Sequence, residues 1–278
     1  MKRILLTISS LILLGSTAYG WGIREHATVA QIAEKHLTPR ARELMKEYLG
    51  GRPMAYYASH TDYYSTEMLL DIGFEPKQGP RITAFPHGYR VDENLKPVRT
   101  IENEDGSIFK HSLYHMERLA NGLKENHAKM NDSVRLVHLY ILIHGIGDMH
   151  CPVHVEIKDR VLYGKYQVYF KNGKRQIKRS MHGVWETQMV GAYNPWTYSD
   201  LANMLDTYTE SQIDTISKGD MYDWAEEVAH LANTLYSDYG IESVIDKNSF
   251  HKKYQSCAEE QLAKAGYRLA KIINYILN

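Results

Sequence analysis

The apolar stretch at about residues 133–149 is the sequence feature that most constrains the fold. Its residues are apolar almost all round a helix, so that helix has to lie at the centre of the molecule. The same stretch carries His144 and Asp148, which are four residues apart and therefore share one helix face. An unpaired buried carboxylate is costly, so the fold has to compensate Asp148, and a cation is the natural candidate.

A metal ion is one way to supply that positive charge. Zinc takes imidazole nitrogen and carboxylate oxygen, usually with four donors per ion. The chain holds a second pair four residues apart, His182 and Glu186, a further histidine at position 154, and 14 histidines in total. The alternative is that these are satisfied core histidines in helical ion pairs. The residues alone do not decide between the two interpretations.

Helical patterning extends over most of the chain. Apolar residues recur at helical spacing, and proline and glycine mark helix ends. The patterns predict helices at about residues 23–37, 39–49, 54–64, 111–125, 133–149, 183–190, 195–207, 221–236 and 254–277. Segments 166–170 and 175–178 flank the turn Lys-Asn-Gly-Lys, which is typical of a hairpin. The sequence therefore predicts one compact, mainly α domain over residues 21–278 with one small β-hairpin.

The first twenty residues predict a secretory signal peptide. Two basic residues precede an apolar core at 4–14, and Ala18 and Gly20 supply the small residues before a cleavage site. The apolar core is too short to span a bilayer comfortably, although an uncleaved anchor is the alternative. We expect cleavage before Trp21 and a secreted or periplasmic product without a membrane anchor.

Charge and cysteine content narrow the interpretation further. The chain is formally neutral, with 33 basic and 33 acidic residues, so a nucleic-acid function would have to rest on the site. Cys151 and Cys257 could pair in an oxidising compartment, and the sequence does not decide this. Because Cys151 lies inside the motif richest in histidine, we expect a buried thiol there rather than a disulfide.

The segment from His144 to His154 closely resembles the core motif of the zinc-dependent single-strand-specific nucleases first described from moulds, which share a superfamily with bacterial zinc phospholipases C. The resemblance continues with Trp21 and a histidine five residues later, Ala-Ser-His-Thr-Asp at 58–62, a histidine in the next loop, the segment ending in Glu186, and Ala-Gly-Tyr-Arg-Leu-Ala at 265–270. It covers essentially all of residues 21–278. It implies the mainly α fold of these proteins.

The resemblance implies three zinc ions and nine ligand residues. One ion would be held by Asp62, His87, His144 and Asp148, the second by Trp21, His26 and another oxygen of Asp148, and the third by His154, His182 and Glu186. The terminal amine and the carbonyl of Trp21 would be the donors. Asp62 and Asp148 are the catalytic candidates, because Asp148 would bridge two ions and Asp62 could orient the attacking water.

The resemblance also implies the activity and the partners. The expected reaction is hydrolysis of single-stranded DNA or RNA to 5′-phosphate products, and 3′-nucleotidase activity is a further expectation. The expected protein is a monomer without a stable protein partner. A phospholipase C-type phosphodiesterase is the alternative, because Glu186 stands where the nucleases have Asp, whereas the spacing of Trp21 and His26 favours the nucleases. A non-catalytic zinc-binding protein is the second alternative.

Departures from the nuclease pattern affect the residues expected to bind substrate. Ser65 stands where the nucleases usually have Arg, and Gly88 stands where they usually have an aromatic residue. We expect Tyr89 to stack on a base instead, because such stacking tolerates any base, and Arg90 to replace the lost cation. His60 stands where the nucleases have Trp, and we expect it to contact substrate.

Two further groups of histidines lie outside this ligand set. His111 and His115 are four residues apart and could clamp a metal, but we expect them to lie on a solvated helix face. We expect His150 to pack locally or to support the neighbouring ligands. Neither group is expected to bind zinc.

The expected role of Trp21 makes a variant with one extra residue before it informative. A free α-amine titrates at about 7.7–8.0, so zinc can displace its proton near neutral pH, whereas an amide nitrogen cannot bind in this way. We expect the extended variant to hold less zinc and to lose activity. Metal analysis and an activity assay on both forms check this, and full zinc content with full activity in the extended form would exclude Trp21 as a ligand.

Overall fold

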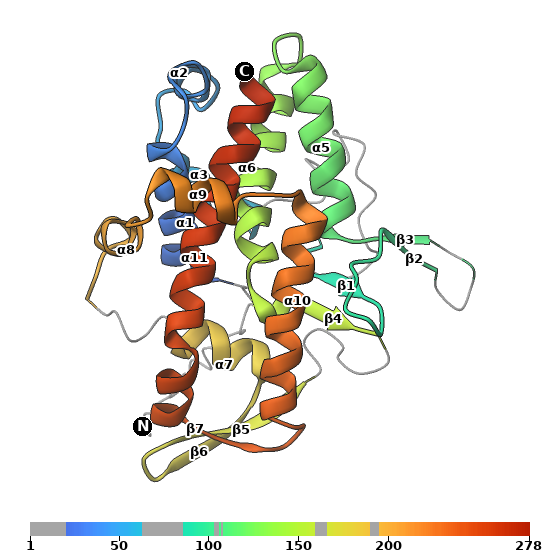
Figure 1. The fold of residues 1–278 in the computed structure, drawn as a ribbon, viewed down its shortest axis with the longest axis vertical. Helices are drawn as coiled ribbons and strands as arrows, with labels where there is room; N and C mark the ends of the chain where they lie inside the picture. Colours follow the sequence, from blue (N-terminus) through green and yellow to red (C-terminus); the bar gives the residue numbers. More distant parts are fainter. Residues whose placement is uncertain (1–20, 63–85, 103–105, 107, 159–165, 190–194) are drawn as a thin grey trace, which may run out of the picture.

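The computed structural model describes residues 21–62, 86–102, 106, 108–158, 166–189 and 195–278, except for the side chains of residues 108, 109 and 186–188 (Figure 1). The expected signal peptide and the last two residues of the helix expected at 54–64 lie outside the described residues. Everything stated below refers to the described part of the chain.

The described chain is mainly α, as the sequence predicts. The longer helices are α1 (Ile23–Lys35), α2 (Pro39–Tyr48), α5 (Ser112–Asn126), α6 (Asp132–Met149), α7 (Met181–Gln188), α8 (Tyr198–Leu205), α9 (Glu210–Ile216), α10 (Met221–Asp238) and α11 (Lys247–Leu277). Shorter turns form α3 (Met54–Tyr57), η1 (His60–Asp62) and η2 (Pro152–His154). The patterning missed α9, because this short helix buries none of its residues.

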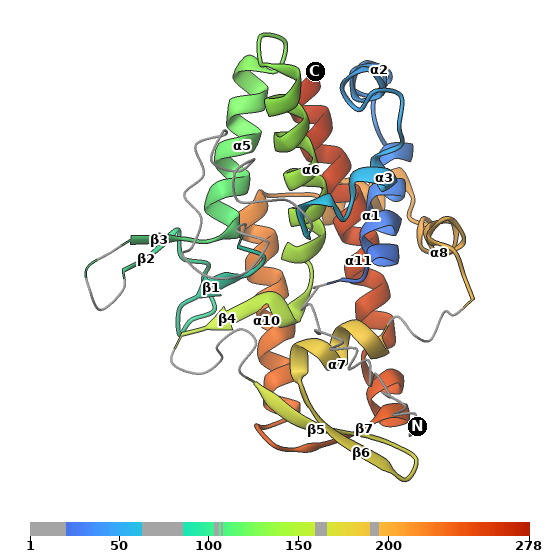
Figure 2. The ribbon, with the colours of Figure 1, turned by 180° about the vertical axis from the view of Figure 1, so that it is seen from behind.

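Helix α6 is the central helix, as its apolar sequence predicts. Every residue from Val137 to Met149 is buried. In the two opposite views, α5 lies along one side of α6 and α11 along another (Figures 1 and 2). No helix in the described residues, α6 included, is long and hydrophobic enough to cross a membrane. The C-terminal end of α6 therefore brings Asp148 into the interior of the protein.

Local signals at the first helices explain why they begin and end where they do. The hydroxyl of Thr38 accepts a hydrogen bond from the backbone N–H of Ala41, and Pro39 occupies the first turn of α2. Gly50 has a φ of 61° and Gly51 a φ of 76°, which ends the helix at little steric cost. The expected helix at 54–64 is shorter than predicted, because α3 ends at Tyr57 and η1 follows it.

The predicted hairpin is present, but the described strands form more than one hairpin. Strands β5 (Gln167–Asn172) and β6 (Arg175–Ser180) pair antiparallel, and β7 (Val244–Asp246) joins β5 in parallel. Two further two-stranded sheets pair β1 (Tyr89–Val91) with β4 (Val155–Ile157) and β2 (Thr100–Glu102) with β3 (Ile108–Lys110). The prediction of a single hairpin is therefore incomplete, because strands of three residues carry too little alternation to be recognised.

The two cysteines agree with the expectation from sequence. Cys151 and Cys257 both lie in the described part of the chain and form no disulfide. Cys151 is fully buried next to the end of α6.

A close approach of α1 and α11 at Gly266 gives a stability prediction. A Cβ added at Gly266 would lie 2.6 Å from Cβ of Ile32 and 3.2 Å from the carbonyl oxygen of Val29. We expect Gly266→Ala to destabilise the protein by about 1–3 kcal/mol, the usual effect of overpacking. Urea denaturation at equal metal content measures this change.

Gly122 in α5 is the matched control for Gly266. A Cβ added at Gly122 meets no heavy atom within 4 Å in the described residues. We expect Gly122→Ala to stabilise the protein by up to about 1 kcal/mol through helix propensity. Equal effects of the two substitutions would contradict the close approach of α1 and α11.

Candidate metal centre

The C-terminal turn of α6 is the meeting point of residues that lie far apart in the sequence. Seven of the nine expected ligand residues lie in one cluster: His26 of α1, Asp62 of η1, His87 just before β1, His144 and Asp148 of α6, His154 of η2 and His182 of α7. All of them are buried except His87, whose side chain is 12% exposed. Five other segments of the fold thus converge on the C-terminal end of α6.

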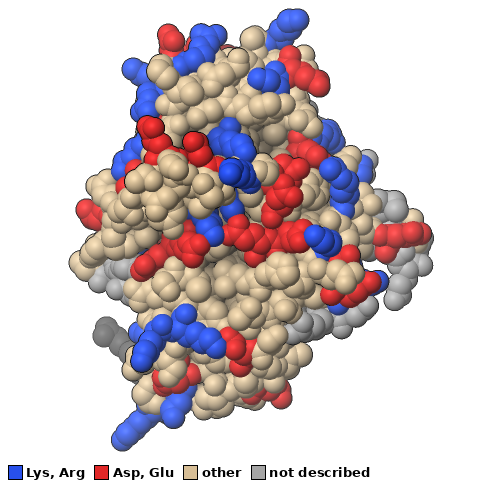
Figure 3. All heavy atoms as spheres, viewed as in Figure 1, with Lys and Arg blue, Asp and Glu red and all other residues tan. Residues whose placement is uncertain are grey.

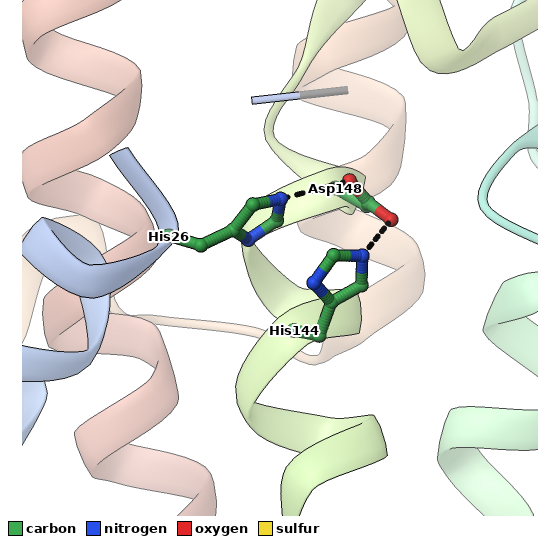
Figure 4. Close-up of side chains that lie close together, drawn as sticks. All are labelled: His26, His144 and Asp148. Carbon is green, nitrogen blue, oxygen red and sulfur yellow. Dashed lines mark ion pairs between the residues drawn. The ribbon is translucent and has the colours of Figure 1, made fainter. Parts of the chain in front are cut away.

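Asp148 lies at the centre of the cluster, and each of its oxygens faces two imidazoles. Its Oδ2 is 2.7 Å from Nδ1 of His87 and 3.0 Å from Nε2 of His144. Its Oδ1 is 3.3 Å from Nδ1 of His154 and 3.4 Å from Nε2 of His26. Figure 4 shows His26 and His144 side by side with Asp148 beyond both rings, and the two rings stack with centroids 3.9 Å apart.

Asp62 extends this arrangement with a second carboxylate. Its Oδ1 lies 3.5 Å from Nε2 of His144 and 3.8 Å from Nε2 of His87. Two groups of three residues have ligand atoms close enough together to hold a metal ion, and His144 belongs to both. These groups are His26, His144 and Asp148, and Asp62, His87 and His144.

The remaining expected ligands lie at the α7 side of the cluster. Nε2 of His154 is 3.1 Å from Nε2 of His182, and the two rings stack at 11°. Two imidazole nitrogens at this distance either share a proton or face a common cation. Trp21 is fully buried, with its ring 6.0 Å from Trp185 of α7. The side chain of Glu186 lies outside the described residues.

The electrostatics of the cluster follow from its burial and its two carboxylates. Burial lowers the pKa of an imidazolium, but the carboxylates of Asp148 and Asp62 outweigh this for His144 and raise its pKa to about 9. Burial raises the pKa of a carboxylic acid, but the neighbouring histidines, His144 first among them, hold the pKa of Asp148 well below its usual range. Asp148 is therefore an anion at the centre of the protein.

Three other imidazoles of the cluster, those of His26, His154 and His182, remain neutral near pH 7. Burial lowers the pKa of His154 to about 4, and burial followed by the charge of His144 lowers the pKa of His26. Burial, with His154 next in importance, also lowers the pKa of His182. Metal binding requires neutral imidazole, so these three side chains hold the protonation state that a metal ion needs.

Some buried polar atoms of the cluster make no hydrogen bond within the described residues and can therefore bind a cation. Neither ring nitrogen of His26 makes a hydrogen bond within the described residues, and the same holds for Oδ1 of Asp148. Buried polar atoms without partners are rare, because each costs about 1–3 kcal/mol. Imidazole nitrogen and carboxylate oxygen are both donors that zinc accepts. The residues present therefore fit a bound metal.

Two supporting groups of the cluster do not stand out in the sequence. The carbonyl of Ala58 accepts a hydrogen bond of 2.8 Å from Nδ1 of His144, which directs Nε2 of that ring toward the two carboxylates. A Cβ at Gly147 would lie only 2.7 Å from Nδ1 of His26. Neither a backbone carbonyl nor a helical glycine is recognisable as a site residue without the fold.

The expected substrate-binding residues agree less well with the structure. Tyr89 is 1% exposed, and its hydroxyl donates a hydrogen bond of 2.9 Å to the carbonyl of Ala225. The prediction that Tyr89 stacks on a base is therefore wrong, because its ring offers no face to solvent. Arg90 is paired with Glu156 at 3.0 Å. His60 is partly buried, and its ring lies 5.1 Å from that of the exposed Tyr56.

The histidines outside the ligand set also differ from expectation. His111 and His115 are buried rather than solvated, and His111 hydrogen-bonds the carbonyl of Val98. His150 packs locally, which is one of the two roles expected for it. It donates from Nδ1 to the carbonyl of Ile146 and accepts at Nε2 from the buried Arg268 of α11.

A buried cluster of imidazoles and carboxylates at the end of a central helix is a candidate site for a catalytic metal ion. The family model described as S1/P1 nuclease matches residues 21–278 of this chain. The chain therefore belongs to the S1/P1 nuclease family, whose members are hydrolases of phosphodiester bonds.

Individual relatives agree with this assignment over almost their whole length. The chain is 26% identical to nuclease S1 of Aspergillus oryzae over 99% of this chain and 98% of that protein. It is 26% identical to nuclease P1 of Penicillium citrinum over 92% of this chain and 97% of that protein. It is 25% identical to nuclease PA3 of a Penicillium species over the same shares of the two chains.

The close approach of Gly147 to His26 predicts that Gly147→Ala weakens metal binding. The added methyl group would displace the His26 ring from Asp148, and displacing a ligand or its support lowers metal affinity by about 10–100-fold. Competition with a chromophoric chelator measures the affinity of the protein for zinc.

Gly145→Ala on the same helix is the control. The three heavy atoms nearest to its added Cβ all belong to the flexible side chain of Met116, with the sulfur at 2.4 Å. We expect this variant to keep the zinc affinity of the wild type. If both variants lose the same affinity, the effect comes from the helix and not from His26.

Proposed function

We propose that the protein is exported and uses a cluster of three zinc ions to hydrolyse single-stranded DNA or RNA to 5′-phosphate products. The observation that carries the proposal is the position of Asp148, whose two buried oxygens each face two imidazoles from separate elements. One carboxylate can then bridge two ions. Membership in a family of nucleases supports the class of substrate.

The described geometry supports a division of the ligands into three sets. Asp62, His87, His144 and Oδ2 of Asp148 would hold one ion, and His26 with Oδ1 of Asp148 and the amine and carbonyl of Trp21 would hold the second. His154, His182 and Glu186 would hold the third. The sequence resemblance supports the inclusion of Trp21 and Glu186, and export with cleavage before Trp21 would create the free amine.

The chain's own residues prepare the reaction in separate ways. When bound, a pair of zinc ions lowers the pKa of water toward 7 and neutralises charge on phosphoryl oxygens. Asp148 fixes the positions of four imidazoles around one anion, so the site is built before substrate arrives. Asp62 is 7% exposed and 3.8 Å from Nε2 of His87, and it orients the attacking water by accepting its hydrogen bond.

The burial of the cluster supports a single-stranded substrate. Its imidazoles are 0–4% exposed except for His87, which is 12% exposed at the side chain and marks the edge that substrate reaches. A recessed cluster admits a flexible strand more easily than a rigid duplex. His60 and the 49% exposed Tyr56 offer rings near Asp62 for a base, in place of the buried Tyr89.

Parallel assays on the processed protein test the proposed function. We expect about three zinc ions per chain and cleavage of single-stranded DNA and RNA in preference to phosphatidylcholine. Preference for the lipid would instead establish the phospholipase C-type activity. A protein with three zinc ions and no activity on any phosphodiester would be a non-catalytic zinc-binding protein.

Asp148→Asn tests the bridging role of Asp148. We expect this variant to lose two ions and to lose activity by about 10²–10³-fold or more, the scale of removing one electrostatic stabiliser of a transition state. The matched control is His230→Ala, which changes an exposed histidine of α10 and should retain both metal and activity. An Asp148→Asn protein with three ions would refute the bridge.

A further inference from the structure

The β5–β6 hairpin concentrates positive charge in a chain that is neutral overall. Its strands and turn contain no acidic residue and five basic ones: Lys171, Lys174, Arg175, Lys178 and Arg179. The hairpin lies at the lower end of the molecule in Figure 1, and Figure 3 shows Lys and Arg side chains extending from this end. This surface is hereafter the basic hairpin.

Only part of this charge is neutralised within the protein. Lys178 pairs with Glu242 at 2.6 Å, and Lys171 lies opposite Asp246 of β7 in the sheet. For Lys174, Arg175 and Arg179, no carboxylate of the described residues lies within ion-pair distance. Positive charge therefore remains at the turn and along β6.

The basic hairpin is directly continuous with the metal centre. Strand β6 ends at Ser180, whose hydroxyl caps α7 by accepting a hydrogen bond of 3.0 Å from the N–H of Gly183. His182 lies in that first turn of α7. At about 3.3 Å per residue, Arg175 at the far end of β6 lies roughly 17 Å along the strand from Ser180. From behind, α7 lies between this sheet and the end of α6 (Figure 2).

The outer face of the same sheet adds an aromatic and an apolar side chain. Tyr169 of β5 stands opposite Lys178 and Val244 in the sheet, and Lys178 lies 5.7 Å from the centre of its ring. Val244 is 54% exposed. Tyr169 and Lys178 share one face of the sheet, whereas Arg175 and Arg179 lie on the other face. The hairpin thus offers positive charge and an aromatic ring, and single-stranded nucleic acid needs both for its phosphates and bases.

We propose that the basic hairpin binds the phosphate backbone of the nucleic acid a few nucleotides away from the bond that is cleaved. The inference rests on the proposed function, since it concerns the same substrate. Charge complementarity identifies the occupant, because a phosphate backbone is the part of the substrate with regularly spaced negative charge. The continuity of β6 with α7 places this surface within reach of a strand held at the cluster.

Protection of an edge strand also explains basic side chains on β6. Strand β6 is at the edge of its sheet, in the order β6-β5-β7, and charged side chains on such edges prevent pairing with other molecules. Edge protection needs charge of either sign, whereas phosphate binding needs positive charge. Reversing the charge keeps the edge protected but repels phosphate, so charge reversal separates them.

The double variant Lys174→Glu/Arg175→Glu, compared with the zinc-loaded wild type, tests the proposal. The substrates are a single-stranded DNA oligonucleotide of about 30 nucleotides and a dinucleotide. We expect kcat/KM on the oligonucleotide to fall at least about tenfold at low salt and kcat/KM on the dinucleotide to stay unchanged. For the oligonucleotide, the slope of log(kcat/KM) against log[salt] should weaken by about 0.7 per lost phosphate contact.

The control variant is Lys46→Glu/Lys129→Glu, which reverses two exposed lysines on or beside α2 and α5, at the opposite end of the molecule. It should behave as the wild type on both substrates. Size-exclusion chromatography of all three proteins should show the same elution volume. An increase in size confined to the hairpin variant would attribute its loss of activity to self-association and overturn the proposal.

The remaining outcomes separate this proposal from the proposed function. Equal activity of the hairpin variant and the wild type on the oligonucleotide would overturn the proposal, as would an equal loss on both substrates. If the wild type cleaves neither substrate, the proposed function fails. Fluorescence anisotropy with a labelled oligonucleotide then decides the present inference, because equal affinity of wild type and hairpin variant overturns it.

Discussion

The arrangement of this protein depends on the need to neutralise one buried negative charge, that of the Asp148 carboxylate. Asp148 sits at the C-terminal end of a helix that is otherwise packed on all sides, and four imidazoles approach its two oxygens. Each imidazole comes from a different segment, except that His144 shares α6 with Asp148. The segments must therefore meet at one point before both oxygens of the carboxylate have imidazole partners. The positions of α1, η2 and the loop before β1 follow from that requirement as much as from apolar packing.

The parts of the fold that sequence predicts are those with local causes. The central helix follows from its unbroken apolar composition, the start of α2 from Thr38 and Pro39, and the ligand pair on α6 from a spacing of four. Burial that arises from distant pairing is not visible in this way. In the sequence, Tyr89 looks like an aromatic residue of a loop that is available for stacking. In the structure it belongs to β1, which pairs with β4, and the hydroxyl of Tyr89 donates a hydrogen bond to α10. His111 and His115 look solvated from the sequence, yet both are buried, and His111 hydrogen-bonds the carbonyl of Val98.

The distribution of charge explains how a neutral chain can act on a polyanion. Net charge sets the average behaviour of the surface, but recognition depends on where charge remains unpaired. The cluster is anionic at its centre and needs cations to approach phosphate at all, whereas the basic hairpin is positive through its own side chains. The first can hold the bond that breaks, and the second can hold the strand that carries it. With both proposals, catalysis and capture belong to neighbouring but separate elements.

The contact between α1 and α11 has a consequence for when the enzyme can exist. Helix α1 carries His26 at the start of the chain, while α11 supplies Gly266 against Ile32 and Asn274 against the backbone of Thr38 and His36 at its very end. Helix α1 therefore reaches its final packing only when α11, far later in the chain, has been synthesised as well. The position of His26 in the cluster thus depends on a helix far from it in the sequence, so a chain cut short before α11 would leave that side of the cluster without its support.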